Sequence, residues 1–147
     1  MHSSIERRIT LRLLGYWEKL RKDRAMPAER DINPEDIKDL WDSCLLIHVK
    51  DLDKPDYQFT YLGDAIRKAC HGTLPPDVSP PLITLHANTR ASYLKVMETR
   101  KPLLEEGEIT VPHGEIIKYR QCLLPLGEGE AVNAIFGGMH FKIFPDK

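Results

Sequence analysis

The chain contains six histidines and three cysteines, the side chains best suited to binding a metal or attacking a substrate. The histidines show neither H-x3-H nor H-E-x-x-H spacing, so the sequence gives no support for a zinc site. Cys44, Cys70 and Cys122 are widely separated and form no C-x-x-C pair. A glycine-rich phosphate loop and a G-x-S-x-G nucleophile elbow are also missing. We therefore expect a protein that is not an enzyme, with a Cys70–His86 pair that meets only in space as the open alternative.

The elements that would position functional side chains follow from the apolar spacing along the chain. Helical spacing predicts a helix over residues 3–22, a short helix from Asn33, another over 64–71 and a long helix over 82–100. β-Branched or alternating segments predict strands over 44–49, 57–62, 103–111, 115–126 and 131–143. Two strands, a helical stretch and three strands predict an α+β fold with one five-stranded antiparallel sheet.

Two local features of the predicted strands bear on where their side chains point. Tyr57, Phe59 and Tyr61 occupy alternate positions, which predicts that all three share one face of the sheet. Gly137 and Gly138 interrupt the last strand, where glycine is typical of a bulge or bend. Both features affect which side chains could meet in one place.

The predicted N-terminal helix is apolar on two sides. Its main stripe recurs at helical spacing and comprises Ile5, Ile9, Leu13, Tyr16 and Leu20. Trp17 lies at the edge of this stripe, and Leu11 and Leu14 lie on roughly the opposite side. A helix that is apolar on two sides can contact the domain body and a second chain together. We therefore interpret Leu11, Leu14 and Trp17 as a homodimer interface, with scattered surface apolar residues as the alternative.

Composition and charge limit the partners of the chain. Its 147 residues fit one domain, and 41% hydrophobic with 29% charged residues is a globular composition. The net charge of −1 argues against nucleic acid or an anionic membrane as the partner. No segment approaches the roughly 20 apolar residues that span a membrane, and no signal-peptide pattern opens the chain. The unpaired cysteines predict a reduced, cytoplasmic location.

Five sequence blocks carry a family resemblance: residues 16–21 (YWEKLR), 26–34 (MPAERDINP), 45–47 (LLI), 59–63 (FTYLG) and 123–126 (LLPL). With them the chain resembles a family of small bacterial PAS-like proteins, common in alphaproteobacteria, that open with a tryptophan-bearing helix. The resemblance implies one PAS-like domain over residues 1–147, with an N-terminal helix over 1–24 and a PAS core over 33–147. It also implies a sensory or regulatory role and names no ligand. We interpret residues 26–34 as a clasp that joins the first helix to the sheet.

PAS-like domains fold a curved sheet against short helices and can leave an interior space for a ligand, apolar with a few polar groups. The candidate lining residues come from strands and helices on both sides of that space: Phe59, Tyr61, Cys70, His86, Thr89, Tyr93, Tyr119, Gln121 and Phe136. They predict a sensory module that binds a small molecule, a signalling protein, or both. The alternative is an interaction adaptor whose core these side chains fill completely.

His86 has an alternative role within this resemblance. It lies on the apolar stripe of the helix predicted over 82–100, where haem-binding PAS domains place their proximal histidine. An imidazole at that place can ligate iron, which makes a haem sensor the second functional hypothesis. A core histidine with a hydrogen-bonded ring is the interpretation that we favour, so no cofactor is required by the sequence.

Overall fold

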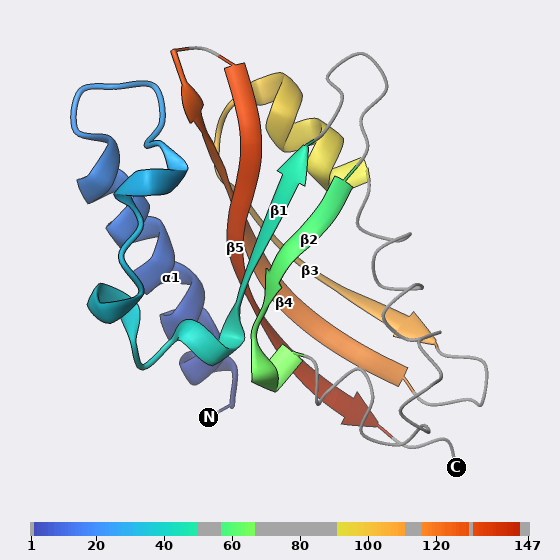
Figure 1. Cartoon of the computed structure of the whole chain (residues 1–147). Helices are drawn as coiled ribbons and strands as arrows, with labels where there is room; N and C mark the ends of the chain where they lie inside the picture. The colour runs from blue at the N-terminus through green and yellow to red at the C-terminus, as the bar shows by residue number, and fades with distance from the viewer. Residues whose placement is uncertain (1, 50–56, 67–90, 111–115, 130, 145–147) are drawn as a thin grey trace.

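The structure is a computed structural model, which describes residues 2–49, 57–66, 91–110, 116–129 and 131–144 (Figure 1). A long helix α1 (His2–Arg21) opens the chain, and three short 3-10 turns follow it, η1 (Glu29–Asp31), η2 (Pro34–Ile37) and η3 (Trp41–Ser43). The strands are β1 (Cys44–Val49), β2 (Tyr57–Leu62), β3 (Leu103–Thr110), β4 (Ile116–Glu128) and β5 (Ala131–Phe144). Residues 91–99 form a further helix. None of the helices in the described ranges is long and apolar enough to cross a membrane.

The five strands form one antiparallel sheet in the order β2-β1-β5-β4-β3. The strands that come first and last in the sequence, β1 and β5, are therefore neighbours in the sheet. Strands β2 and β3 form its two edges. This arrangement confirms the predicted α+β, PAS-like fold. All five predicted strands are present, and their bounds differ from the prediction by at most two residues at either end.

The register of the sheet assigns its side chains to two faces. Residues paired across antiparallel strands point to the same face, and successive residues along a strand alternate. One face, which we call the α1 face, carries Leu104, Glu106, Arg120, Cys122, Phe136 and Gly138. The other, which we call the far face, carries Leu103, Glu105, Tyr119, Gln121, Leu123 and Met139. In Figure 1, α1 and the helix over residues 91–99 lie on opposite sides of the sheet.

Helix α1 packs closely on the α1 face because one position of β5 beneath it, Gly138, carries no side chain. A Cβ atom added at Gly138 would lie 2.2 Å from Leu13 Cδ1, so the glycine makes room for this leucine. Leu13 is fully buried, which confirms the predicted stripe at its centre. Trp17, one turn later, donates a hydrogen bond from Nε1 to the Pro125 carbonyl oxygen at 2.8 Å. The helix is thereby fixed to β4 as well as β5.

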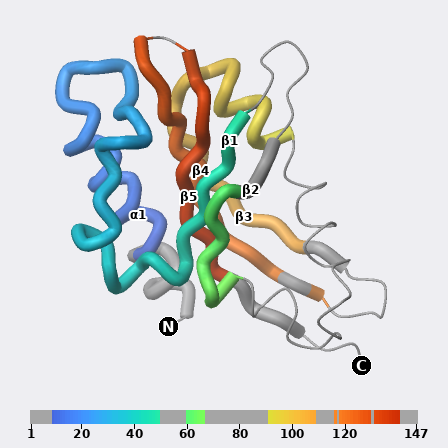
Figure 2. The backbone as a smooth tube through the Cα atoms, in the orientation of Figure 1, coloured from blue at the N-terminus to red at the C-terminus, as the bar shows by residue number. Residues whose placement is uncertain are grey.

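After α1 the chain runs back along the helix toward β1, as Figure 2 shows. Gly127 N donates to the Pro27 carbonyl oxygen at 3.0 Å, which joins this segment to β4. Asp31 accepts a hydrogen bond from Ala28 N at 2.9 Å and forms an ion pair with Arg24 at 3.0 Å. These contacts agree with the interpretation of residues 26–34 as a clasp between the first helix and the sheet.

The short helix predicted from Asn33 is replaced by two 3-10 turns. Asn33 caps the first of them, accepting from Glu35 N at 3.2 Å, and Pro34 takes the first position. The cap and the proline were therefore predicted correctly. The helical length was wrong, because η2 comprises only the four residues Pro34–Ile37 and Leu40 precedes a separate turn, η3.

The alternation predicted for the second strand was also wrong. The register pairs Tyr61 with Leu46 but Phe59 with Ile47, and it shifts between Leu46 and Ile47. Leu46 and Ile47 are consecutive and point to opposite faces, so positions 59 and 61 do not share a face. A β-bulge, which inserts one residue into the ladder, is the physical reason.

Gly137 and Gly138, in contrast, lie in a continuous ladder with no register shift, so of the predicted bulge or bend the bulge was wrong. The glycines are required by close approach instead. A Cβ atom at Gly137 would lie 2.3 Å from the Cys122 carbonyl oxygen, closer than any real Cβ contact. The bulge of this strand pair lies between Leu126 and Gly127.

Candidate functional site

The predicted lining residues divide into three groups in the structure. Cys70, His86 and Thr89 lie outside the described residues, so the haem hypothesis and the Cys70–His86 pair remain predictions. Phe59 is placed only by its backbone pairing with Ile47. The other five are described side chains, and the sheet separates them: Tyr61, Tyr93, Tyr119, Gln121 and Phe136.

Tyr61 and Phe136 lie on the α1 face, where they pack around Trp41. The Trp41 and Tyr61 rings stack with centroids 4.4 Å apart, and the Trp41 and Phe136 centroids are 6.3 Å apart. The Tyr61 hydroxyl donates to the Trp41 carbonyl oxygen at 3.0 Å. This cluster closes the sheet beneath the chain that precedes β1. Its polar group has a partner, so we assign it to packing rather than to a ligand site.

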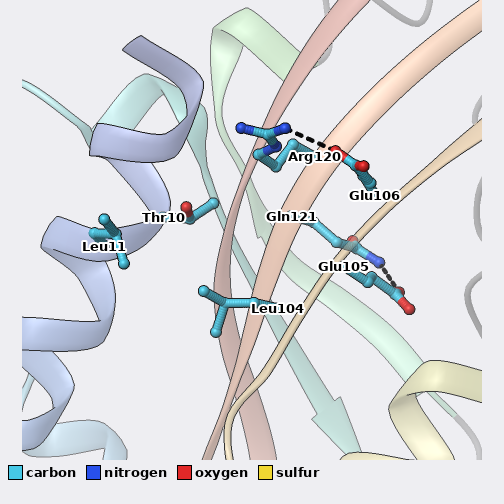
Figure 3. A pocket seen from close by; sticks show the side chains of 7 residues that line it. All are labelled: Thr10, Leu11, Leu104, Glu105, Glu106, Arg120 and Gln121. Atoms are coloured by element: carbon cyan, nitrogen blue, oxygen red, sulfur yellow. Dashed lines mark hydrogen bonds and ion pairs between the residues drawn. The ribbon is translucent and has the colours of Figure 1, made fainter. Parts of the chain in front are cut away.

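Glu105, Tyr119 and Gln121 form a polar cluster on the far face. Gln121 pairs in register with Glu105, and Tyr119 pairs with Gly107 two residues further along β3. Gln121 Nε2 donates to Glu105 Oε1 at 2.5 Å. Figure 3 shows the Gln121 and Glu105 side chains leaving the strands on the side opposite Leu104 and Arg120. The cluster therefore faces away from α1.

The environment of this cluster is apolar. Leu123 on the same face of β4 is fully buried, and so are Ile47 and Ile135 on the neighbouring strands. Tyr93 and Val96, from the helix over residues 91–99, are buried in the same core. A few polar groups set among apolar side chains is the usual composition of a small-molecule site.

Gln121 is the unusual member of the cluster because it is fully buried and only half satisfied. Its side chain is 0% exposed, and among the described residues its Oε1 atom has no hydrogen-bond partner. A carboxylate only accepts hydrogen bonds, so the amide must turn its NH2 group toward Glu105 and leave the carbonyl oxygen unpaired. An orphaned buried acceptor costs about 1–3 kcal/mol. That cost would be recovered by a ligand that donates a hydrogen bond.

Tyr119 lies beside this amide and is held over a glycine. A Cβ atom at Gly107 would lie 2.7 Å from the Tyr119 hydroxyl oxygen and 2.8 Å from its Cζ atom, so the glycine leaves room for the ring in this position. Burial, and then the negative charge of Glu105, raise the pKa of Tyr119 above its ordinary value. The phenol therefore stays protonated at neutral pH and can donate or accept a hydrogen bond.

The described cysteines are unsuited to nucleophilic chemistry. Cys44 and Cys122 are both fully buried on the α1 face, and each pairs in register with Gly138. Burial raises the pKa of the Cys122 thiol to about 12, and burial also raises that of Cys44. A thiolate is the reactive species, so neither residue is activated. Within the described ranges there is likewise no cluster of three or more metal-ligating side chains.

A shallow groove of about 240 Å³ lies between α1 and the β3 edge of the sheet (Figure 3). Leu11 on the helix and Leu104 on β3 line it, and they are 51% and 42% exposed. Glu105 and Gln121 also belong to its lining. The Arg120–Glu106 ion pair, at 2.7 Å, lies at the same groove.

Leu14 is half-buried against the core, and Trp17 is 4% exposed with its indole N–H already bonded. Of the three predicted interface residues, Leu11 is thus the one that presents a largely exposed side chain.

Sequence reasoning missed Glu105 and Leu104 as candidate residues. Glu105 and Glu106 are adjacent and identical in type, and only the register separates them into one far-face and one α1-face residue. The available signal was the alternation of Leu103, Glu105 and Gly107 against Tyr119 and Gln121 across the predicted hairpin. That alternation gives the pairing only once the turn between the strands is fixed.

Comparison with known proteins adds little to this geometry. No protein-family model matches the chain, and no curated protein matches it either. Among solved structures it is similar to one described as an RNA-binding Light-Oxygen-Voltage receptor, with 19% identity and a TM-score of 0.45 over 67% of this chain. It is also similar to a variant of RsLOV, with 15% identity and a TM-score of 0.45 over 73% of this chain. The similar regions span 29% and 66% of those two chains.

Proposed function

We propose that this chain is a non-catalytic sensory module that holds a small molecule against the far face of its sheet. The observation that supports this most directly is the buried Oε1 atom of Gln121, which has no partner among the described residues. Buried polar groups in folded proteins are nearly always hydrogen-bonded, and the exceptions tend to have a functional reason. A ligand that donates to this oxygen supplies one.

The surroundings of Gln121 support binding rather than turnover. The described thiols are buried and protonated, and the Gln121 amide donates its hydrogen bond to a carboxylate, Glu105. Ligand occupancy can be transmitted if the ligand binds one conformation of the domain better than another. The module would then pass its signal through the elements that cover the sheet.

Native mass spectrometry of the freshly purified chain tests this proposal. We expect an extra mass that dissociates on denaturation, and we expect Gln121→Met to lose it, because methionine keeps the volume but removes the acceptor. Tyr61→Phe is the matched control, since it removes a hydroxyl from the α1 face and should retain the mass. A chain that retains nothing and binds no compound of a fragment library by NMR would contradict the proposal.

An absorption spectrum of the same purified sample distinguishes the haem alternative from the far-face site. A haem sensor centred on His86 would show a Soret absorption band that His86→Ala abolishes and Gln121→Met leaves intact. Loss of the retained mass in Gln121→Met without any Soret band supports the far-face site instead.

A second function, as an interaction module, has its own supporting observation. Leu11 and Leu104 together form an exposed apolar surface along one groove, next to the edge strand β3. We propose that a second copy of this chain covers that surface, so that the module acts as a homodimer. A signalling protein that competes for the same surface is the alternative partner.

A further inference from the structure

We infer that the far-face site selects a small organic cation whose N–H groups donate to Gln121 Oε1 and Glu105, and whose body is apolar. The inference rests on the proposed function, because it names the ligand class of the same site. The position of the two acceptors next to each other is the observation that supports the inference. Gln121 and Glu105 are cross-strand partners, and the contact at 2.5 Å places their polar ends side by side.

Both groups offer hydrogen-bond acceptors to a ligand, and Glu105 as a carboxylate can only accept. The Gln121 amide donates one N–H of its NH2 group to Glu105, and its carbonyl oxygen has no partner among the described residues. Glu105 is half-buried, and a carboxylate has more acceptor positions than one donor fills. A ligand that brought only acceptors, such as a carboxylic acid, would leave Gln121 Oε1 unpaired and would face a like charge.

The strand residues that the structure describes give the far face a negative charge only. Among the strand residues that the structure describes, Glu105 is the one charged residue at a far-face register position. The nearest basic residue of β4, Arg120, points to the other face and binds Glu106 at 2.7 Å. A cation on the far face is therefore attracted by Glu105 without meeting a strand cation, and its N–H groups satisfy both acceptors.

Tyr119 adds a third contact suited to a cation. Gly107 leaves room for the ring across β3, which allows the phenol to lie beside the Glu105–Gln121 pair. A cation over an aromatic face within about 6 Å of the ring centre is attracted by it. Leu123 and Val96, both fully buried in the same core, supply the apolar surroundings that favour an apolar ligand body. An amidinium, guanidinium or protonated amine on a flat ring combines these features.

Three ring compounds of equal size test the inference on the full chain: benzamidinium, neutral benzamide and anionic benzoate. We expect titrations by NMR and calorimetry to rank them in that order, with benzamidinium at least about tenfold tighter than benzoate. Glu105→Gln should weaken benzamidinium about tenfold or more, as expected for a hydrogen-bonded charge. Glu106→Gln is the matched control, because it removes the same charge from the next residue on the α1 face and should leave the affinity unchanged.

Gln121→Met provides a second variant whose folding can be checked by its thermal midpoint. It should lose benzamidinium binding while the midpoint stays close to that of the wild type, since the substitution also removes an unpaired acceptor. Equal or tighter binding of benzoate, or no binding of any of the three compounds, would overturn the inference. These outcomes would not by themselves overturn the proposed function. It would still hold if the purified chain retained another molecule that Gln121→Met releases.

Discussion

Cys44 and Cys122 show how burial alone sets the chemistry of a side chain. They lie on β1 and β4, and both pair with Gly138 on the strand between them. Each is fully buried on the face that α1 covers. Desolvation disfavours the thiolate, so it is the main cause of the raised pKa of both thiols. They serve the core as small apolar groups.

The raised thiol pKa values predict a loss of stability in alkali. Unfolded Cys122 loses its proton near the ordinary value of 9.0, whereas the folded protein holds it to about 12. The unfolded state therefore binds fewer protons above pH 9, and the free energy of unfolding falls by about 1.4 kcal/mol per pH unit for each such thiol. The raised pKa values of Tyr16 and Tyr119 act in the same direction. Denaturant titrations between pH 8 and 11.5 measure the slope.

Cys122→Ala isolates the contribution of one thiol to that slope. The variant loses some stability at every pH, but its decline in alkali should be shallower than that of the wild type. An identical pH dependence in the two proteins would contradict the buried, protonated thiol.

Asp31 and Arg30 are neighbours in the clasp, yet they should differ in importance. Asp31 accepts from Ala28 N and pairs with Arg24, and these contacts lower its pKa. We expect Asp31→Ala to cost about 1–2 kcal/mol, a contribution that is present above about pH 4 and lost as the pH falls through the lowered pKa. Arg30 pairs with Glu128 in full contact with solvent, so Arg30→Ala should leave the urea midpoint unchanged. Equal losses in the two variants would show that Asp31 has no special role.

At the scale of elements, β5 connects the two layers of the fold through its glycines. Gly138 admits Leu13 of α1, and Gly137 admits the backbone of β4 on the other side of the strand. A leucine methyl can turn aside, but a strand carbonyl cannot. The glycine that faces the backbone should therefore be the less tolerant of the two.

Alanine substitutions in β5 and α1 test this order. We expect Gly138→Ala to cost about 1–2 kcal/mol and Gly137→Ala about 3 kcal/mol, within the range of overpacked cores. Gly15→Ala is the control, because nothing lies within 4 Å of its added Cβ in α1 and helix propensity favours alanine by up to about 1 kcal/mol. Thermal unfolding ranks the three variants. A greater loss in Gly138→Ala than in Gly137→Ala would contradict the argument.

The elements themselves could be predicted from the sequence, because apolar spacing is a local property. All five strands and α1 follow from it, and the residue types at positions 33 and 34 predict the Asn33 cap. What failed depends on pairing between strands. The register shift beside Leu46 and the close approach at Gly137 are set by neighbours that are distant in sequence. The same limit applies to the candidate site, where Tyr61 and Phe136 were grouped with Gln121 although the sheet lies between them.

For the whole molecule, the sheet separates two roles. The far face carries the polar cluster of Glu105, Tyr119 and Gln121, and the α1 face carries packed aromatic rings and buried thiols. Ligand binding on one face would reach the other through β4, whose consecutive residues Arg120 and Gln121 point to opposite faces of the sheet and both line the groove beside α1. A change in ligand occupancy should then alter the surface beside α1.

That surface should be where two copies of the chain associate. Leu11 and Leu104 are both highly exposed and line one groove, and burying them removes apolar area from water. We expect Leu11→Glu and Leu104→Glu each to weaken the dimer at least tenfold in sedimentation velocity experiments over a concentration series. Leu94→Glu is the matched control, because Leu94 is 42% exposed like Leu104 but belongs to the helix over residues 91–99. A dimer that both groove variants leave intact, or that only Leu94→Glu disrupts, would place the interface elsewhere.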